Sequence, residues 1–220
     1  MRIRVIEALM LLALARGAFA ATHYVDANSA SPTPPYTNWA SAARVIQDAV
    51  NAAVTGDEVV VTNGIYATGG RPVGTNVLVN RVAVDKPLAL RSVNGPQFTG
   101  IQGYRVPGIG NGDGAVRCVY LAQGASLSGF TLTNGATRAA NPLDTESSGG
   151  GVWCESSSIT VSNCLITGNT SSYDGGGAYR GLLENCTLIG NSALDGGGGA
   201  YESILVTNFF GSVLFAEVPS

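Results

Sequence analysis

The chain contains Ser162-Asn163-Cys164-Leu165-Ile166-Thr167-Gly168-Asn169 and, 22 residues later, Glu184-Asn185-Cys186-Thr187-Leu188-Ile189-Gly190-Asn191. A glycine-rich phrase keeps step with this repeat: Gly150-Gly151-Val152-Trp153 returns as Gly176-Gly177-Ala178-Tyr179 and again as Gly198-Gly199-Ala200-Tyr201. Two independent phrases that share one period predict a solenoid, in which each repeat forms one coil.

An earlier copy of the repeat is degenerate. We match Gly114-Ala115-Val116-Arg117-Cys118 to residues 150–154, and residues 127–135 to the phrase that contains Asn163 and Cys164. The extra length predicts a loop over 136–148. Because short β-branched runs alternate with Gly and Asn, we expect two or three short strands in each coil and regular coils over about 114–205.

The repeats resemble those of the right-handed parallel β-helix proteins, the pectate-lyase-like superfamily, over roughly residues 22–205. The resemblance implies an all-β solenoid with stacked asparagines in its turns, here at Asn163 and Asn185 and at Asn169 and Asn191. The phrases are also similar to the repeats of bacterial surface and outer-membrane β-helix proteins. Activity is left open, because adhesins, lyases, hydrolases and phage tailspikes share this architecture.

Residues 1–20 have the pattern of a secretory signal peptide. Basic residues precede an apolar run over 5–15, and small residues lead up to Ala20. We therefore expect cleavage after Ala20, a single mature domain over 21–220, and a location that is secreted, periplasmic or at the cell surface. An N-terminal membrane anchor is the alternative, although the run is short for a span, and no later stretch is apolar enough to cross a bilayer.

The composition disfavours nucleic acid as a partner. The formal net charge is −3, and Lys86 is the single lysine, so no basic patch is available for a phosphate backbone. The 30 glycines suit tightly turned coils, and a hydrophobic content of 45% argues against disorder.

Helical periodicity occurs near the N-terminus. Apolar residues between Trp39 and Ala53 fall on one face, which predicts an amphipathic helix over 39–53 with Asn38 as its N-cap. In the family that this chain resembles, such a helix closes the open end of the first coil, where it covers an apolar bore and an unpaired strand edge. Strands are expected at 22–26, within 56–66 between two turns, and at 77–84, 88–93, 100–104 and 116–121, with a loop over 106–113.

The four cysteines allow two interpretations. Cys164 and Cys186 share one repeat position, and Cys118 is matched to Cys154. Disulfides are expected in an exported chain, but side chains in register on parallel neighbours point the same way, which fits the disulfide torsion poorly. Stacked buried thiols are the favoured interpretation.

The residues that suggest a binding site are Trp153, Tyr179 and Tyr201, which share one repeat position beside Val152, Ala178 and Ala200. If the smaller residues face the bore, the aromatic rings point outward in a row. Such a row could stack on the sugar rings of a polysaccharide or cell-surface glycan. The alternative is that the rings stack on each other and shield the sheet.

The evidence for catalysis is weaker. Asp174 and Asp195 each begin an Asp-Gly-Gly-Gly turn, and paired carboxylates are what glycoside hydrolysis needs, although Asp is also an ordinary turn residue. For lyase chemistry the repeats offer Arg117, Arg138 and Arg180 as the basic residue, without a dense acidic cluster. No metal or cofactor site is predicted, because the chain has no CxxC pair and its one histidine, His23, precedes the repeats.

These observations favour an exported, non-enzymatic scaffold that is adhesin-like or contacts a glycan. The first alternative is a lyase or glycoside hydrolase that acts on an acidic polysaccharide. A second is a truncated fragment of a longer β-helix protein, because the repeat decays after Tyr201 and leaves an incomplete last coil that ends in the apolar residues Phe209, Phe210 and Phe215.

Overall fold

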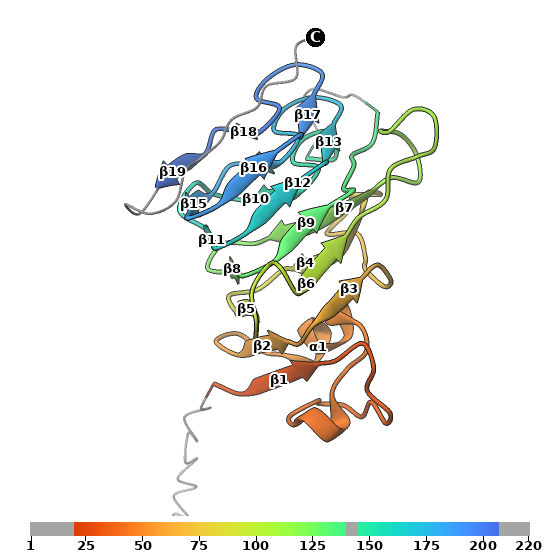
Figure 1. The fold of residues 1–220 in the computed structure, drawn as a ribbon, viewed down its shortest axis with the longest axis vertical. Helices are drawn as coiled ribbons and strands as arrows, with labels where there is room; N and C mark the ends of the chain where they lie inside the picture. The colour runs from red at the N-terminus through yellow and green to blue at the C-terminus, as the bar shows by residue number, and fades with distance from the viewer. Residues whose placement is uncertain (1–19, 140–144, 207–220) are drawn as a thin grey trace, which may run out of the picture.

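The structure is a computed structural model that describes residues 20–139 and 145–206. Within these ranges the chain winds into an elongated stack of coils, with its first strand at one end and its last at the other (Figure 1). Every pairing between named strands is parallel, so the fold is an all-β parallel β-helix. Most of the predicted signal peptide and the decayed repeat after residue 206 lie outside the described residues.

Three parallel sheets, here named A, B and C, form the sides of the described coils. Sheet A runs in the order β1 (Thr22–Val25), β2 (Glu58–Val61), β5 (Ala89–Ser92), β8 (Ser126–Ser128), β11 (Thr160–Ser162), β15 (Leu182–Glu184) and β19 (Ile204–Val206). Sheet B contains β3 (Gly64–Tyr66), β6 (Thr99–Gln102), β9 (Thr131–Thr133), β12 (Leu165–Thr167) and β16 (Thr187–Ile189). Sheet C contains β4 (Val79–Val84), β7 (Val116–Leu121), β10 (Val152–Cys154), β14 (Ala178–Tyr179) and β18 (Ala200–Tyr201). The short strands β13 (Thr170–Ser171) and β17 (Ser192–Ala193) pair between sheets B and C.

The register confirms the repeat in the last coils and corrects it in the earlier one. Leu165 pairs with Thr187, and Ala178 with Ala200, as the repeated phrases predict. In β7, however, Val119 pairs with Val152, and Cys154 lies level with Leu121 rather than with Cys118. The match between glycines was misleading there. In a sheet with one buried face, the side chains that fill the bore set the register, and the preceding glycines do not.

The predicted helix over 39–53 is correct only in part. A 3₁₀ turn η1 (Trp39–Ser41) and a helix α1 (Ile46–Ala52) form, with extended backbone between them. Asn38 caps the 3₁₀ turn, where its Oδ1 accepts the Ser41 N–H at 3.0 Å, and the backbone of Ala43 pairs with β1. The helix is interrupted because the N–H and C=O of Ala43 hydrogen-bond to Tyr24 and Asp26 instead.

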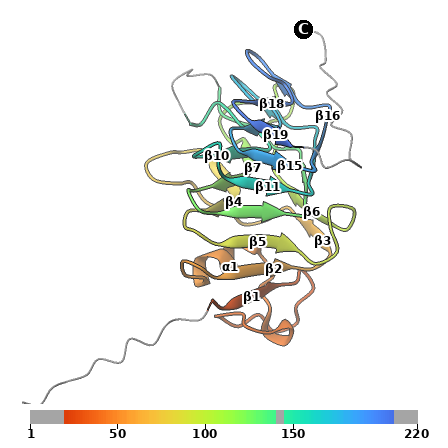
Figure 2. The same cartoon turned by 90° about the vertical axis from the view of Figure 1, so that its left-hand side faces the viewer.

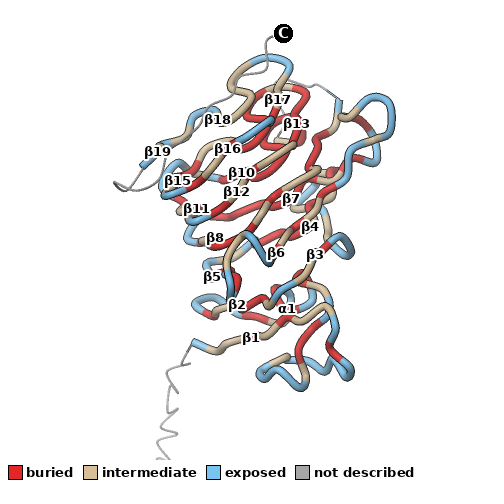
Figure 3. The backbone as a smooth tube through the Cα atoms, viewed as in Figure 1, coloured by how far each residue is buried: buried red, intermediate tan, exposed pale blue. Residues whose placement is uncertain are grey.

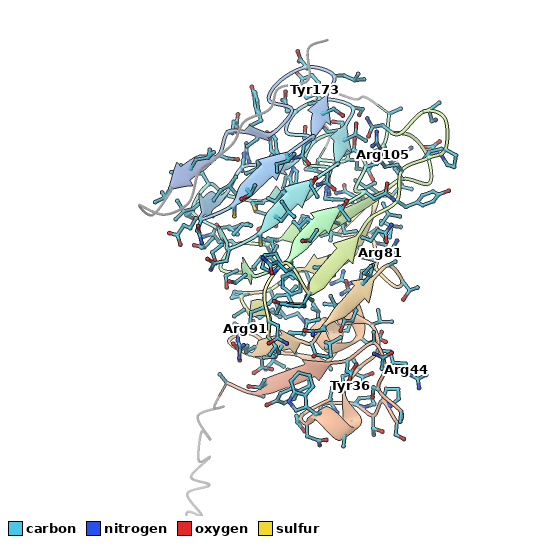
Figure 4. The ribbon with its side chains drawn as sticks, in the orientation of Figure 1. Tyr36, Arg44, Arg81, Arg91, Arg105 and Tyr173 are labelled. Carbon is cyan, nitrogen blue, oxygen red and sulfur yellow. The ribbon has the colours of Figure 1, made fainter. Side chains whose placement is uncertain are left out.

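Helix α1 covers the edge of sheet C. Its Gln47 side chain accepts the N–H of Ala83 in β4 at 2.7 Å and donates to the Ala83 carbonyl at 3.3 Å, as a neighbouring strand would. Lys86 Nζ donates to the carbonyls of Val50 and Ala53 at the helix C-terminus. The helix therefore takes the place of a strand, while β1 lies further out along the axis (Figure 2). Tyr36 and Arg44 lie beside β1 at this same end (Figure 4).

The bore is a continuous apolar core that runs from Val25 to Leu188, and buried residues recur from coil to coil (Figure 3). Two asparagine ladders lie beside it. Asn191 Oδ1 accepts the Asn169 side chain at 3.0 Å, and Asn185 donates to Asn163 at 2.7 Å. Asn163 and Asn185 both have φ near 52°, a left-handed conformation that asparagine tolerates better than most residues. The stacked asparagines predicted from the repeat are confirmed.

The four cysteines are buried as free thiols. Cys164 and Cys186 occupy successive coils, and their thiols donate to the backbone carbonyls of Ser162 and Val161. Burial raises the pKa of Cys118 and of Cys154 to about 12, so both are protonated at neutral pH. None of the described helices is long and apolar enough to cross a membrane.

Candidate functional site

An aromatic row runs across four successive strands of sheet C. Tyr120, Trp153, Tyr179 and Tyr201 come from β7, β10, β14 and β18, and each pairs in register with the next. Neighbouring ring centroids are 5.2, 6.2 and 6.0 Å apart, with interplanar angles between 7° and 12°. The three rings named from the sequence are therefore brought together, and Tyr120 is a fourth member that the mistaken register of β7 concealed.

Access to the row increases towards the C-terminal coils. Tyr120 and Trp153 are each 7% exposed and pack with Val73, Tyr179 is half-buried, and Tyr201 is 36% exposed. Val73 belongs to the long segment 67–78 between β3 and β4. The rings at the N-terminal side thus stack under cover, and only Tyr179 and Tyr201 offer faces or edges to a ligand.

A shallow polar cleft of about 450 Å³ adjoins the accessible end of the row. It is lined by Glu155, Ser156, Ser157, Arg180 and Glu202. These residues occupy the turns that follow β10, β14 and β18, directly after the strands that carry the rings. Carboxylates, hydroxyls and a guanidinium group beside an aromatic ring are suited to hydrogen-bond and stack on a sugar.

Arg180 links the cleft to the rings. Its guanidinium carbon lies 5.1 Å from the Tyr179 ring centroid, and its Nε donates to Glu202 Oε2 at 2.9 Å. The Glu202 carboxylate raises the pKa of Arg180. Arg180 and Glu202 have φ values of 58° and 48°. Such angles are strained for residues other than Gly, Asn or Asp and are often found at functional positions.

Glu155 fixes the opposite wall. Its carboxylate accepts the hydroxyl of Tyr120 and the N–H of Gln123, the latter at 2.7 Å. Burial, together with this carboxylate, raises the pKa of Tyr120. Neither Glu155 nor Glu202 was singled out from the sequence. They could have been found from their position in the sequence, because each follows the repeated aromatic residue by one or two positions.

Asp174 and Asp195 lie on neighbouring coils, near the end of the molecule where Tyr173 lies (Figure 4). Asp174 is 6% exposed, and its Oδ1 accepts the Gly196 N–H at 2.9 Å, whereas Asp195 is exposed. Burial raises the pKa of Asp174, and the charges of Asp195 and Glu202 add to this effect. The backbone N–H of Asp195 donates to the carbonyl of Tyr173 at 3.2 Å.

The other basic residues considered from the sequence hold loops in place. Arg117 is 1% exposed and donates to the carbonyls of Gly149 and Ser148 and to Asn80 Oδ1. Arg138 pairs with Asp113 and Glu146 at 2.9 Å each. Among residues 20–139 and 145–206, no group of three or more His, Cys, Asp or Glu is arranged to hold a metal ion.

Comparison with known proteins gives a distant structural likeness. No family model matches the chain, and no curated protein matches it. A solved structure of a rhamnogalacturonan lyase is similar, with a TM-score of 0.44 and 14% identity over 82% of this chain. The match spans 44% of the length of that lyase.

Proposed function

We propose that this protein is exported and contacts a polysaccharide or cell-surface glycan through the polar cleft and the accessible end of the aromatic row. The observation that carries the proposal is the placement of Arg180. Its side chain lines the cleft, packs on the Tyr179 ring and pairs with Glu202. One wall thereby combines a ring face with charged hydrogen-bonding groups. This is a common composition for sugar recognition, in which rings stack and polar groups fix orientation.

The charge of the cleft limits the class of sugar that it would bind. Two carboxylates, Glu155 and Glu202, face one guanidinium group in its lining. An anionic uronate would meet net repulsion there, whereas the hydroxyls of neutral sugars can donate to both carboxylates. Neutral glycans are therefore the preferred ligands of this proposal.

A glycan array probed with the full chain, followed by titration of any bound glycan, tests the proposal. Tyr201→Ala should weaken binding about five- to tenfold, because ring stacking contributes on the order of 1 kcal/mol. Tyr104→Ala is the matched control, since Tyr104 is 44% exposed and lies outside the row. Equal binding by both variants, or no binding by folded wild-type protein, would contradict the proposal.

Glycoside hydrolysis remains a second candidate because of one observation. Asp174 is a buried carboxyl with a raised pKa beside the exposed Asp195, and a general acid in a glycosidase needs such a raised pKa. If this pair is catalytic, the wild-type protein will shorten a polysaccharide chain, and Asp174→Asn will abolish that activity while binding persists. Binding without any cleavage by the wild type would favour the non-enzymatic scaffold.

A further inference from the structure

The carboxyl group of Asp57 lies buried at the start of the first coil, surrounded by donors. It is 4% exposed and accepts the N–H of Val54 at 2.8 Å and the N–H of Ala21 at 2.8 Å. The Nε2 of His23 lies 2.9 Å from Asp57 Oδ2, the oxygen that also accepts the Val54 N–H, whereas Oδ1 accepts the Ala21 N–H. Burial alone would raise the pKa of Asp57, but these hydrogen bonds outweigh it, so the pKa lies below its ordinary value and the group is a carboxylate at neutral pH.

Ala21 is fixed through both of its backbone polar groups. Its nitrogen donates to Asp57, and its carbonyl accepts the N–H of Glu58 at 2.9 Å. Ala20, the preceding residue, is exposed. Ala18-Phe19-Ala20 has small residues at the two positions that a signal peptidase recognises. The bond predicted to be cleaved therefore adjoins a nitrogen that the fold already holds.

We propose that a signal peptidase hydrolyses the Ala20–Ala21 bond and that Asp57 then binds the new N-terminus, with His23 positioning its carboxylate. The reaction consumes one water molecule: Ala20 leaves as a carboxylate, and the amide nitrogen of Ala21 becomes an ammonium group. A neutral donor that already lies 2.8 Å from Asp57 Oδ1 thus becomes a cationic one. The contact, until then charged only on the side of the acceptor, becomes an ion pair between an ammonium group and a carboxylate.

The position of His23 supports the proposed binding of the N-terminus by Asp57. Its Nδ1 lies 2.6 Å from the Pro35 carbonyl oxygen, and its Nε2 lies 2.9 Å from Asp57 Oδ2. The two ring nitrogens thus face the loop that carries Pro35 and the carboxylate, so the ring bridges them. This leaves Oδ1 of Asp57 directed at Ala21. Processing would therefore strengthen the contact between β1 and the turn before β2.

Amine labelling of the exported, processed full chain tests this inference. Mass spectrometry first locates the N-terminus, and an amine-reactive ester then reports how fast the α-amine reacts in folded and in urea-unfolded protein. Because Lys86 is the single lysine, label on the α-amine is readily separated from label on the one lysine side chain. We expect Ala21 as the first residue, and an α-amine that reacts about ten- to a hundredfold more slowly in the folded wild type than in Asp57→Asn.

Asp26→Asn is the matched control, because Asp26 lies in the same coil and its carboxylate accepts the local N–H of Asn28. This variant should keep the protection. If Asp57→Asn does not fold, the folded-to-unfolded labelling ratio of the wild type still decides the question. A mature N-terminus elsewhere, or a folded α-amine that reacts as fast as the unfolded one, would overturn the inference. Neither readout depends on glycan binding.

Discussion

At the scale of single residues, Gly176 and Gly190 illustrate two different reasons why a coil needs glycine: lack of space and a left-handed backbone. A methyl group on Gly176 would collide with the backbone carbonyl of Ser192 in the next coil, whereas one on Gly190 would meet open space. Gly190 instead has φ +60°. Gly176→Ala should therefore lower the free energy of unfolding by about 3 kcal/mol or more, and Gly190→Ala by about 1 kcal/mol. Urea unfolding followed by circular dichroism measures both, and equal losses would contradict the steric explanation.

Glu146 gives the second prediction at this scale, a dependence of stability on pH. Burial would raise its pKa, but the N–H groups of Leu78 and Val77 and the Arg138 guanidinium outweigh burial and lower it. A carboxyl with a lower pKa in the folded state stabilises above its unfolded pKa of about 4.3, and that stabilisation is lost as the pH falls through the folded pKa. Glu146→Gln should flatten the decline in stability between about pH 5 and pH 3.

The control for this prediction is Asp113→Asn. The Asp113 side chain is 86% exposed, although it contacts the same Arg138. Exposed ion pairs contribute little, so this variant should keep the wild-type pH profile. Thermal unfolding across the pH range provides the measurement, and parallel profiles for Glu146→Gln and wild type would count against the prediction.

The sequence predicted the stacked asparagines well, because their neighbours are copies of the same phrase. Asn169 and Asn191 repeat, so their stacking followed from spacing alone. The role of Gly176 could not be predicted in the same way, because it depends on a carbonyl of the next coil. Glu146 likewise bonds to Val77 and Leu78, far away in sequence, and no local pattern announces that contact.

At the scale of elements, α1 shows how one side chain completes a sheet. Gln47 satisfies both backbone groups of Ala83 at the open edge of β4. Gln47→Ala leaves these two buried groups without that partner and should destabilise the protein by about 2–3 kcal/mol. Asn51→Ala is the control on the same helix, because it removes only an exposed acceptor of Gln47 and should cost under about 1 kcal/mol. Similar losses in both variants would show that Gln47 acts through packing alone.

The sequence predicted the position of an element where a periodic pattern extends over many residues. The prediction failed where a backbone contact to another element interrupts that pattern. The apolar face over 39–53 is real, yet Ala43 pairs with β1 and divides the helix. In β7 the pair Val119 and Leu121 fills the bore. Had these two residues set the register in place of the glycines, Tyr120 would have joined the aromatic row from the sequence alone.

At the scale of the whole molecule, the long insertions occur at one corner of the coil. The segments 67–78, 103–115 and 134–151 all connect sheet B to sheet C. They contact one another: Asn76 donates to Thr145 at 2.8 Å, and Gly112 N to Thr137 O at 2.9 Å. The 22-residue period appears only where this corner is short. The accessible rings, Tyr179 and Tyr201, belong to the same short coils, so the regular repeat and the candidate site coincide.

The C-terminal end of the described coils carries the last prediction. Strand β19 is the final described strand of sheet A, and its Ile204 is 52% exposed. An exposed apolar strand edge promotes pairing between molecules, and a lysine on it opposes such pairing. Light scattering should therefore show a molar mass that rises with concentration for the wild type, and a constant monomer mass for Ile204→Lys. Ile109→Lys, at a loop residue that is 71% exposed, should behave as the wild type. A constant mass for the wild type would mean that this edge is covered in solution.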